Sequence, residues 1–250
     1  AEGLIAVATE GTQGAVVEIN AETDFVARNE QFQNFVLKTS QIALSAKDAE
    51  DLMGKPYGNG KTVQETLTEL IATIGENMTL RRVARQSVSK GVIVSYIHSA
   101  LAPSLGKIGV LVALESDAPA DKLNELGKQI AMHIAAARPE FLDTTSVDPA
   151  VIAREKAVLT EKHRASGKPE DRLEGIVMGD LTKNFFGQIC LMEQAFVMDG
   201  KTKISDVVAN AAKDLGTAVT LKGFSRFELG EGIEKEEEDF AAEVAKVANG

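Results

Sequence analysis

The chain has 250 residues, 44% of them hydrophobic and 26% charged, which is ordinary for a globular protein and enough for one large domain or two to three small ones. It carries 27 Lys and Arg against 37 Asp and Glu, and this net charge of −10 argues against direct nucleic-acid binding and suits a basic or mixed protein surface. No apolar run is long enough to span a membrane, and the N-terminus lacks a signal-peptide pattern, so the sequence predicts no membrane association.

The first 90 residues read as one unit of strands and helices. Residues 3–10 and 15–20 are rich in β-forming residues and flank a turn-like segment, which predicts a hairpin. A helix is predicted over 24–45, with one buried face formed by Phe32, Val36, Thr39 and Ala43. Phe25 lies seven residues before Phe32 and would share that face. A helix over 63–74 that ends at Gly75, and a strand over 77–88, complete the unit.

The second half repeats this pattern. Residues 91–98 and 109–115 predict a hairpin across a longer loop, residues 121–138 predict a helix, and residues 217–229 predict a long strand. When Gly75 is set over Gly216, Thr79, Leu80 and Arg85 fall on Thr220, Leu221 and Arg226. The alignment predicts a duplicated module of hairpin, two helices and strand.

Two further segments lie outside the modules. Residues 148–184 predict two helices around the turn Ser166-Gly-Lys-Pro169, in which Gly ends one helix and Pro opens the next. Their partly apolar stripes comprise Val151, Glu155, Val158, Leu159 and Lys162 on the first helix, and Leu173, Ile176, Val177 and Phe185 on the second. With so little core, the pair packs either on another subunit or partner, or back on its own domain. Residues 234–247 predict a final helix with acids crowded at its N-terminal end.

The predicted fold class is therefore α+β. It comprises two related modules, each a small antiparallel three-stranded sheet packed with helices, plus an inserted antiparallel helical hairpin (coiled coil) and a C-terminal helix. The expected boundaries are residues 1–90 for the N-terminal core subdomain, 91–147 with 186–230 for the C-terminal core subdomain, 148–185 for the hairpin, and 231–250 for the C-terminal module.

Catalytic chemistry is not indicated by any motif. The sequence contains no phosphate-binding loop, dinucleotide fingerprint, zinc spacing or nucleophile elbow. Its histidines, His98, His133 and His163, lie in different predicted elements, and the single cysteine, Cys190, reads as a small buried residue. These observations predict a binding protein without a cofactor, a metal site or a bond-making active site. An unrelated enzyme on the duplicated fold stays open, and turnover of a small substrate without a partner would indicate it.

The segment Thr23-Asp-Phe-Val26 strongly resembles the elongation factor Ts family, the guanine-nucleotide exchange factors for elongation factor Tu. Other segments look like family segments in family order, namely 107–110, 130–141, 166–169, 230–235 and 240–245. The resemblance covers essentially the whole chain. Bacterial members usually begin with a small ubiquitin-associated-like domain that contains a Thr-Gly-Ala-Gly-type motif; this domain is absent here, and we expect a trimmed chain.

The resemblance implies a set of interface residues. The family's Asp-Phe pair matches Asp24 and Phe25; its Phe wedges between helices of the GTPase domain and disturbs the Mg²⁺ site, so Thr23 to Val26 are expected to bind elongation factor Tu. The family's Ile-Gly pair matches Ile108 and Gly109 and presses near the phosphate loop, and a family His at the interface matches His133.

The residues alone also permit ordinary roles at these positions. Asp24 suits the first turn of a helix, Phe25 and His133 suit a core, and Ile108 with Gly109 suit the start of a strand. However, the second module has no Asp-Phe pair in the equivalent segment, 114–119, which favours a functional role for Phe25.

The implied function is an exchange factor of translation elongation in a bacterial cytoplasm that promotes GDP release, with elongation factor Tu as partner and a possible homodimer through the helical hairpin. The alternative is a scaffold or chaperone of elongation factor Tu without exchange activity.

Overall fold

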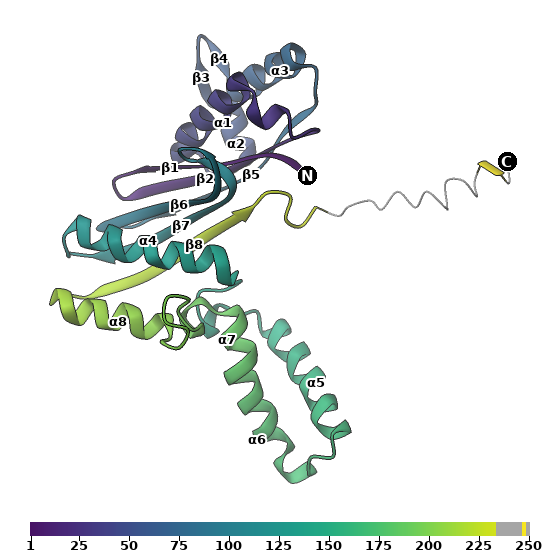
Figure 1. The fold of residues 1–250 in the computed structure, drawn as a ribbon, viewed down its shortest axis with the longest axis vertical. Coiled ribbons are helices and arrows are strands. Elements are labelled where there is room, and N and C mark those ends of the chain that lie inside the picture. The colour runs from purple at the N-terminus through teal and green to yellow at the C-terminus, as the bar shows by residue number, and fades with distance from the viewer. Residues whose placement is uncertain (234–246, 249–250) are drawn as a thin grey trace.

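Two antiparallel sheets lie back to back in the computed structural model of the chain, and each is covered on its outer side by helices (Figure 1). The structure describes residues 1–233 and 247–248. Strands β1 (Glu2–Glu10) and β7 (Leu105–Ser116) join the two sheets into one six-stranded sheet, through the pairs Ile5 with Gly106 and Ala6 with Leu105. The predicted α+β class with small antiparallel sheets is confirmed.

The first module follows the order predicted from the sequence. Its strands and main helices are β1 (Glu2–Glu10), β2 (Gln13–Ala21), α1 (Glu30–Ile42), α2 (Ala49–Gly54), α3 (Val63–Ile74) and β5 (Met78–Ser87). A short 3₁₀-helix (Val26–Arg28) precedes α1, another (Ala43–Ser45) follows it, and a two-stranded hairpin of β3 (Pro56–Gly58) and β4 (Lys61–Thr62) precedes α3. The elements α2, β3 and β4 were not predicted from the sequence.

The second module has the same order with one insertion. Its elements are β6 (Gly91–Ala102), β7 (Leu105–Ser116), α4 (Ala120–Ala137), α8 (Ile204–Leu215) and β8 (Val219–Glu228). The prediction of a longer loop between β6 and β7 was wrong, because both strands continue until only Pro103 and Ser104 separate them. Between α4 and α8 lie the 3₁₀-helices Thr144–Ser146 and Leu191–Glu193, α5 (Pro149–Ala165), α6 (Glu170–Asp180), a π-helical turn (Leu181–Phe185) and α7 (Phe186–Ile189).

The two modules correspond in detail. Gly75 and Gly216 end α3 and α8 with φ angles of 82° and 68°, a left-handed conformation that glycine adopts without steric cost. The last strand of each module pairs with its hairpin with one register shift, and the residue just before that shift is Leu80, paired with Ile19, in the first module and Leu221, paired with Leu114, in the second. The equivalence that the sequence alignment proposed for Leu80 and Leu221 therefore holds in the backbone.

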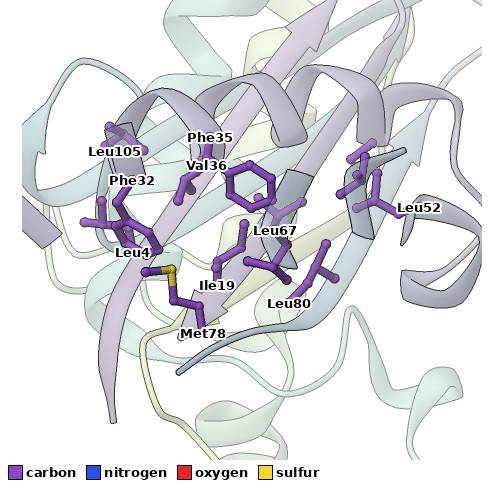
Figure 2. Packing of buried hydrophobic residues seen from close by; sticks show 14 of the residues in the cluster. Leu4, Ile19, Phe32, Phe35, Val36, Leu52, Leu67, Met78, Leu80 and Leu105 are labelled. Carbon is purple, nitrogen blue, oxygen red and sulfur yellow. The ribbon is translucent and has the colours of Figure 1, made fainter. Parts of the chain in front are cut away.

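The core of the first module lies between its sheet and α1. Phe32, Phe35 and Val36 point from α1 toward the strands, where they meet residues such as Leu4 and Ile19 (Figure 2). The predicted helix start at residue 24 was wrong. The side chain of Asn29 accepts a hydrogen bond from the backbone N–H of Phe32 at 3.1 Å, which caps α1 and makes Glu30 its first residue. Phe25 therefore lies before the helix and does not share the face of Phe32.

A separate core lies between the two sheets. It contains side chains from both modules, among them Ile5, Val16, Ile93, Leu111 and Phe227. Glycine allows the sheets to approach here, because a Cβ on Gly14 would lie 2.5 Å from Cγ2 of Ile93. This core buries the inner face of each sheet.

The helical hairpin projects away from the layered body, with α5 and α6 side by side (Figure 1). Its own core is small, as predicted, and consists of Leu159, Leu173, Val177 and Leu181. The predicted stripe on α5 was partly wrong, since Val158 is 60% exposed and Lys162 is also exposed. Nε2 of His163 contacts a carboxylate oxygen of Asp180 at 2.8 Å and adds a polar link between the two helices. Dimerisation through the hairpin stays a prediction.

The predicted C-terminal helix over 234–247 lies outside the described residues, apart from its last position. The subdomain boundaries also stay predictions, although each module has its own hydrophobic cluster.

Glu18 of β2 connects the first module to the end of β8. Its carboxylate is fully buried and accepts hydrogen bonds from Arg82 Nε at 2.7 Å, Arg81 Nη1 at 3.0 Å, Asn20 Nδ2 at 2.9 Å and the backbone N–H of Gly230 at 2.9 Å. Burial raises the pKa of Glu18, but the hydrogen bonds and the Arg82 charge outweigh burial, so that the pKa lies below its ordinary value of 4.5.

The end of β8 also lies beside the start of the chain. A Cβ on Gly230 would lie 3.0 Å from Cβ of Ala1, and the side chain of Arg81 donates to the carbonyl of Glu231. The first and last described segments of the layered body are therefore neighbours.

We predict that Glu18→Gln lowers the free energy of unfolding at pH 7 by about 2–4 kcal/mol, because it removes the charge that Arg81 and Arg82 share. A carboxylate with a lowered pKa stabilises the fold above its ordinary pKa of 4.5, and this contribution is lost as the pH falls through the lower, folded-state value. Urea unfolding over a pH series should show the difference between the two proteins shrinking below pH 4.5. A difference that does not change with pH would contradict this account.

Candidate functional site

The turn Thr23–Val26 is fixed to the first module at both ends. The backbone N–H of Thr23 donates to a carboxylate oxygen of Glu76 at 3.1 Å, and its hydroxyl donates to the other oxygen. Val26 is buried in the first core, so it anchors the turn and has little surface to offer a partner. Gln33 Nε2 donates to the carbonyl of Ala27 at 2.9 Å and holds the segment that leads into α1.

Phe25 points away from this anchored turn and is 77% exposed. It is the single phenylalanine among the large exposed hydrophobic side chains of the part of the chain that the structure describes. Exposing a phenylalanine forgoes about 1.5–3 kcal/mol of burial energy, so a rigid turn that presents one to solvent favours a binding role. Asp24, the neighbour of Phe25, is also exposed.

Ile108 and Gly109 lie in β7, in the second module. Ile108 is half-buried against the core under α4 and pairs with His98 on β6 and Glu228 on β8. Gly109 is buried, and a Cβ there would lie 2.6 Å from Cγ2 of Ile5 and 3.1 Å from a methyl carbon of Val16. Gly109 thus permits the close contact of the two sheets. It has no exposed surface through which it could make its predicted contact with a partner.

His133 is fully buried on α4, and its ring fixes the loop that follows α7. Its Nδ1 accepts from the backbone N–H of Val197 at 3.1 Å, which leaves Nε2 as the donor to Gln194 Oε1 at 2.9 Å. Burial lowers the pKa of His133, although the hydrogen bond to Gln194 raises it in part, so the neutral ring is favoured. The buried ring of His133 is therefore not accessible for the predicted direct contact with a partner. It can still position the loop around Val197.

Three exposed apolar side chains near His133 were not predicted from the sequence. They are Met132, Val197 and Met198, which we call the methionine patch, and Met198 is 52% exposed. Met132 precedes His133 on α4, and Val197 is the residue that His133 holds. Flexible methionine side chains are common on protein-binding surfaces. The signal in the sequence was the run Phe196-Val-Met198 outside any predicted helix.

The predicted residues thus form two separate groups. Thr23 to Val26 belong to the first module, whereas Ile108, Gly109 and His133 belong to the second.

The described residues offer little for bond-making chemistry. Cys190 is buried, and burial raises the pKa of its thiol to about 11, so it is not a nucleophile near neutral pH. Within residues 1–233 and 247–248 there is no group of three or more His, Cys, Asp and Glu side chains that could hold a metal ion. Over the same residues, no helix has the length and apolar character needed to cross a membrane.

Comparison with known proteins gives a consistent result. Residues 22–231 match the family model described as Elongation factor TS. The chain is 59% identical over 250 residues to Elongation factor Ts of Rhodospirillum centenum, with 99% of the chain and 81% of that relative covered. It is 56% identical over 252 residues to Elongation factor Ts of Erythrobacter litoralis, with 100% of the chain and 82% of the relative covered.

We predict that Gly109→Ala lowers the free energy of unfolding by about 1–3 kcal/mol, because the added methyl group must displace Ile5 or separate the sheets. Gly175→Ala on α6 is the matched control, since a Cβ there meets nothing within 4 Å and should stabilise the helix by about 0.5–1 kcal/mol. Chemical unfolding of both variants tests the difference. Unchanged stability in the Gly109 variant would contradict the packing role.

Proposed function

Because the chain belongs to the elongation factor Ts family and is therefore a translation elongation factor, we propose that it binds elongation factor Tu and promotes the release of GDP. The observation that carries this proposal is Phe25, an exposed aromatic side chain on a turn braced by Glu76 and Val26. The proposed partner is a protein and the proposed place is the bacterial cytoplasm, where translation occurs.

The proposed mechanism requires no acid, base or cofactor from this chain. An exchange factor must bind the nucleotide-free GTPase more tightly than the GDP-bound form, and by linkage each ligand then weakens the other by the same factor. A GTPase holds GDP through backbone amides of its phosphate loop and through Mg²⁺. A side chain that wedges apart the helices beside the Mg²⁺ site therefore weakens GDP binding.

Phe25 is suited to act as this wedge because its turn is already ordered. A rigid aromatic side chain loses little conformational freedom when it enters a pocket, so most of its burial energy remains for displacing the partner's helices. Asp24 and Thr23 accompany Phe25 in the proposed contact. Ile108 is retained as a contact near the phosphate loop, with Gly109 supporting its strand.

The methionine patch is the proposed second contact. It lies on the second module, and His133 fixes its position from below through the backbone of Val197. Two contacts on separate modules would hold the factor in one orientation while Phe25 enters the GTPase domain. His133 contributes to this interface by positioning Val197 and Met198 without touching the partner.

We predict that Phe25→Ala slows the stimulated release of fluorescent GDP from elongation factor Tu by roughly thirtyfold or more, the effect of losing about 2 kcal/mol at an interface hot spot. Its fold should be intact, because the side chain is exposed. Leu101→Ala, another exposed apolar residue, is the control and should exchange normally.

The same assay distinguishes the alternative function. A stable complex with an unchanged GDP release rate would indicate a scaffold or chaperone of elongation factor Tu. Equal stimulation by the intact protein and the Phe25 variant would remove the wedge from the mechanism.

We also predict that Met198→Ser weakens binding to nucleotide-free elongation factor Tu by about tenfold, because a buried apolar contact is replaced by a poorly satisfied hydroxyl. Met178→Ser on the helical hairpin is the matched control, since Met178 is an exposed methionine outside the patch. Affinity measured by calorimetry should fall only for Met198→Ser. An equal loss in both variants would contradict the assignment of the patch.

A further inference from the structure

A basic cavity of about 910 Å³ opens where β5, β8 and the segment after α4 meet. Gln86 of β5 bridges the two strands by donating to the carbonyl of Phe224 at 3.0 Å. The charged side chains that line the cavity are Arg82, Arg138, Lys222 and Arg226, together with Glu140 and Glu231. A group of four cations is unexpected in a chain with a net charge of −10, and neither Phe25 nor the methionine patch contributes to it.

Arg226 provides a buried donor at this cavity. Its side chain is only 5% exposed, and its two terminal nitrogens are engaged: Nη1 contacts Glu228 at 3.3 Å and Nη2 donates to the carbonyl of Ala135 at 3.1 Å. Its Nε is buried and has no acceptor among the residues that the structure describes. Because buried N–H groups are almost always paired, the Nε of Arg226 indicates a further acceptor beyond those that the described residues supply.

Arg138 provides an independent indication. It ends α4 with a φ of 52°, in the left-handed region where α3 and α8 carry Gly75 and Gly216. A residue with a side chain is less stable than glycine in this conformation. The chain nevertheless has arginine at this position; Arg138 lines the cavity, and its guanidinium contacts Glu228 at 3.1 Å. The strained position therefore favours a use for the side chain itself.

The carboxylate partners of these cations are shared or at the limit of contact. Glu228 is shared between Arg138 and Arg226. Glu18 contacts Arg82 but is shared with Arg81. Lys222 is half-exposed and its only close carboxylate within the described residues is Glu115 at 3.7 Å, so it can turn toward a ligand.

We propose that the basic cavity binds the phosphate group of a small molecule. A tetrahedral phosphate accepts several hydrogen bonds at once, which matches the guanidinium groups of Arg138 and Arg226 and the ammonium group of Lys222. The lining also includes the apolar side chains Phe141, Leu142 and Phe224, which we call the apolar wall. The cavity volume is that of sites for ligands of nucleotide size. The phosphate comes either from inorganic phosphate or from an organic phosphate whose remaining part contacts this apolar wall.

The test is calorimetric titration of the whole protein with inorganic phosphate and with AMP, at low ionic strength. Lys222→Gln and Arg138→Gly should each weaken binding by about tenfold, the loss of one charge-assisted hydrogen bond. Arg138→Gly should keep or raise the unfolding temperature, because glycine is preferred at a φ of 52°. Lys122→Gln removes the same charge from the exposed start of α4 and should leave the affinity unchanged.

The outcomes separate the two sources. Tighter binding of AMP than of phosphate supports an organic ligand that uses the apolar wall, whereas equal binding supports inorganic phosphate. No saturable binding of either compound would overturn the proposal. An equal loss of affinity in the Lys122 variant would overturn it too, because a general charge effect would then explain the binding. Lys222→Gln and Arg138→Gly leave Phe25 and the methionine patch unchanged, so both variants should retain exchange activity.

Discussion

The contact between the backs of the two sheets determines where the other parts of this protein lie. Ile5, Val16 and Leu111 fill the space between the sheets, and Gly14 and Gly109 let the backbones approach. With both inner faces occupied, the helices must cover the outer faces, and binding residues are left to turns, loops and the projecting hairpin. The proposed binding residues Phe25, on a turn, and Met198, on a loop, follow this rule. Gly109, although it resembles an interface residue of the family, has a structural position instead.

Local patterns in the sequence were sufficient for most of the fold. The end of α3 at Gly75 and the strand that follows it were predicted correctly, because a left-handed glycine and a β-rich run leave few alternatives. The burial of Phe32, Val36 and Thr39 on α1 was also predicted from their spacing, whereas that of Phe35 was not. The first residue of α1 was not predicted either, because the capping role of Asn29 competed with an acid and an aromatic that also suit a helix start.

The candidate site was less predictable because burial is a property of the tertiary structure. Spacing placed His133 at the edge of a core stripe but could not show that Gln194 and Val197, more than sixty residues later, enclose its ring. The basic cavity has the same character, since Arg82, Arg138 and Arg226 come from three elements that are distant in the sequence. Family resemblance identified Phe25, and only the braced turn explains physically how Phe25 is held away from the core.

The neighbouring positions of Ala1 and Gly230 have a consequence for the connectivity of the chain. Segments attached before β1 and after β8 would leave the layered body from one place, next to the buried carboxylate of Glu18. A short linker could therefore join the two ends of the body, and a new pair of ends could be opened at the turn between α5 and α6, far from the sheets (Figure 1). The elements could thus follow one another in a different order along the chain and still pack in the same way, as expected for a fold built from two copies of one module.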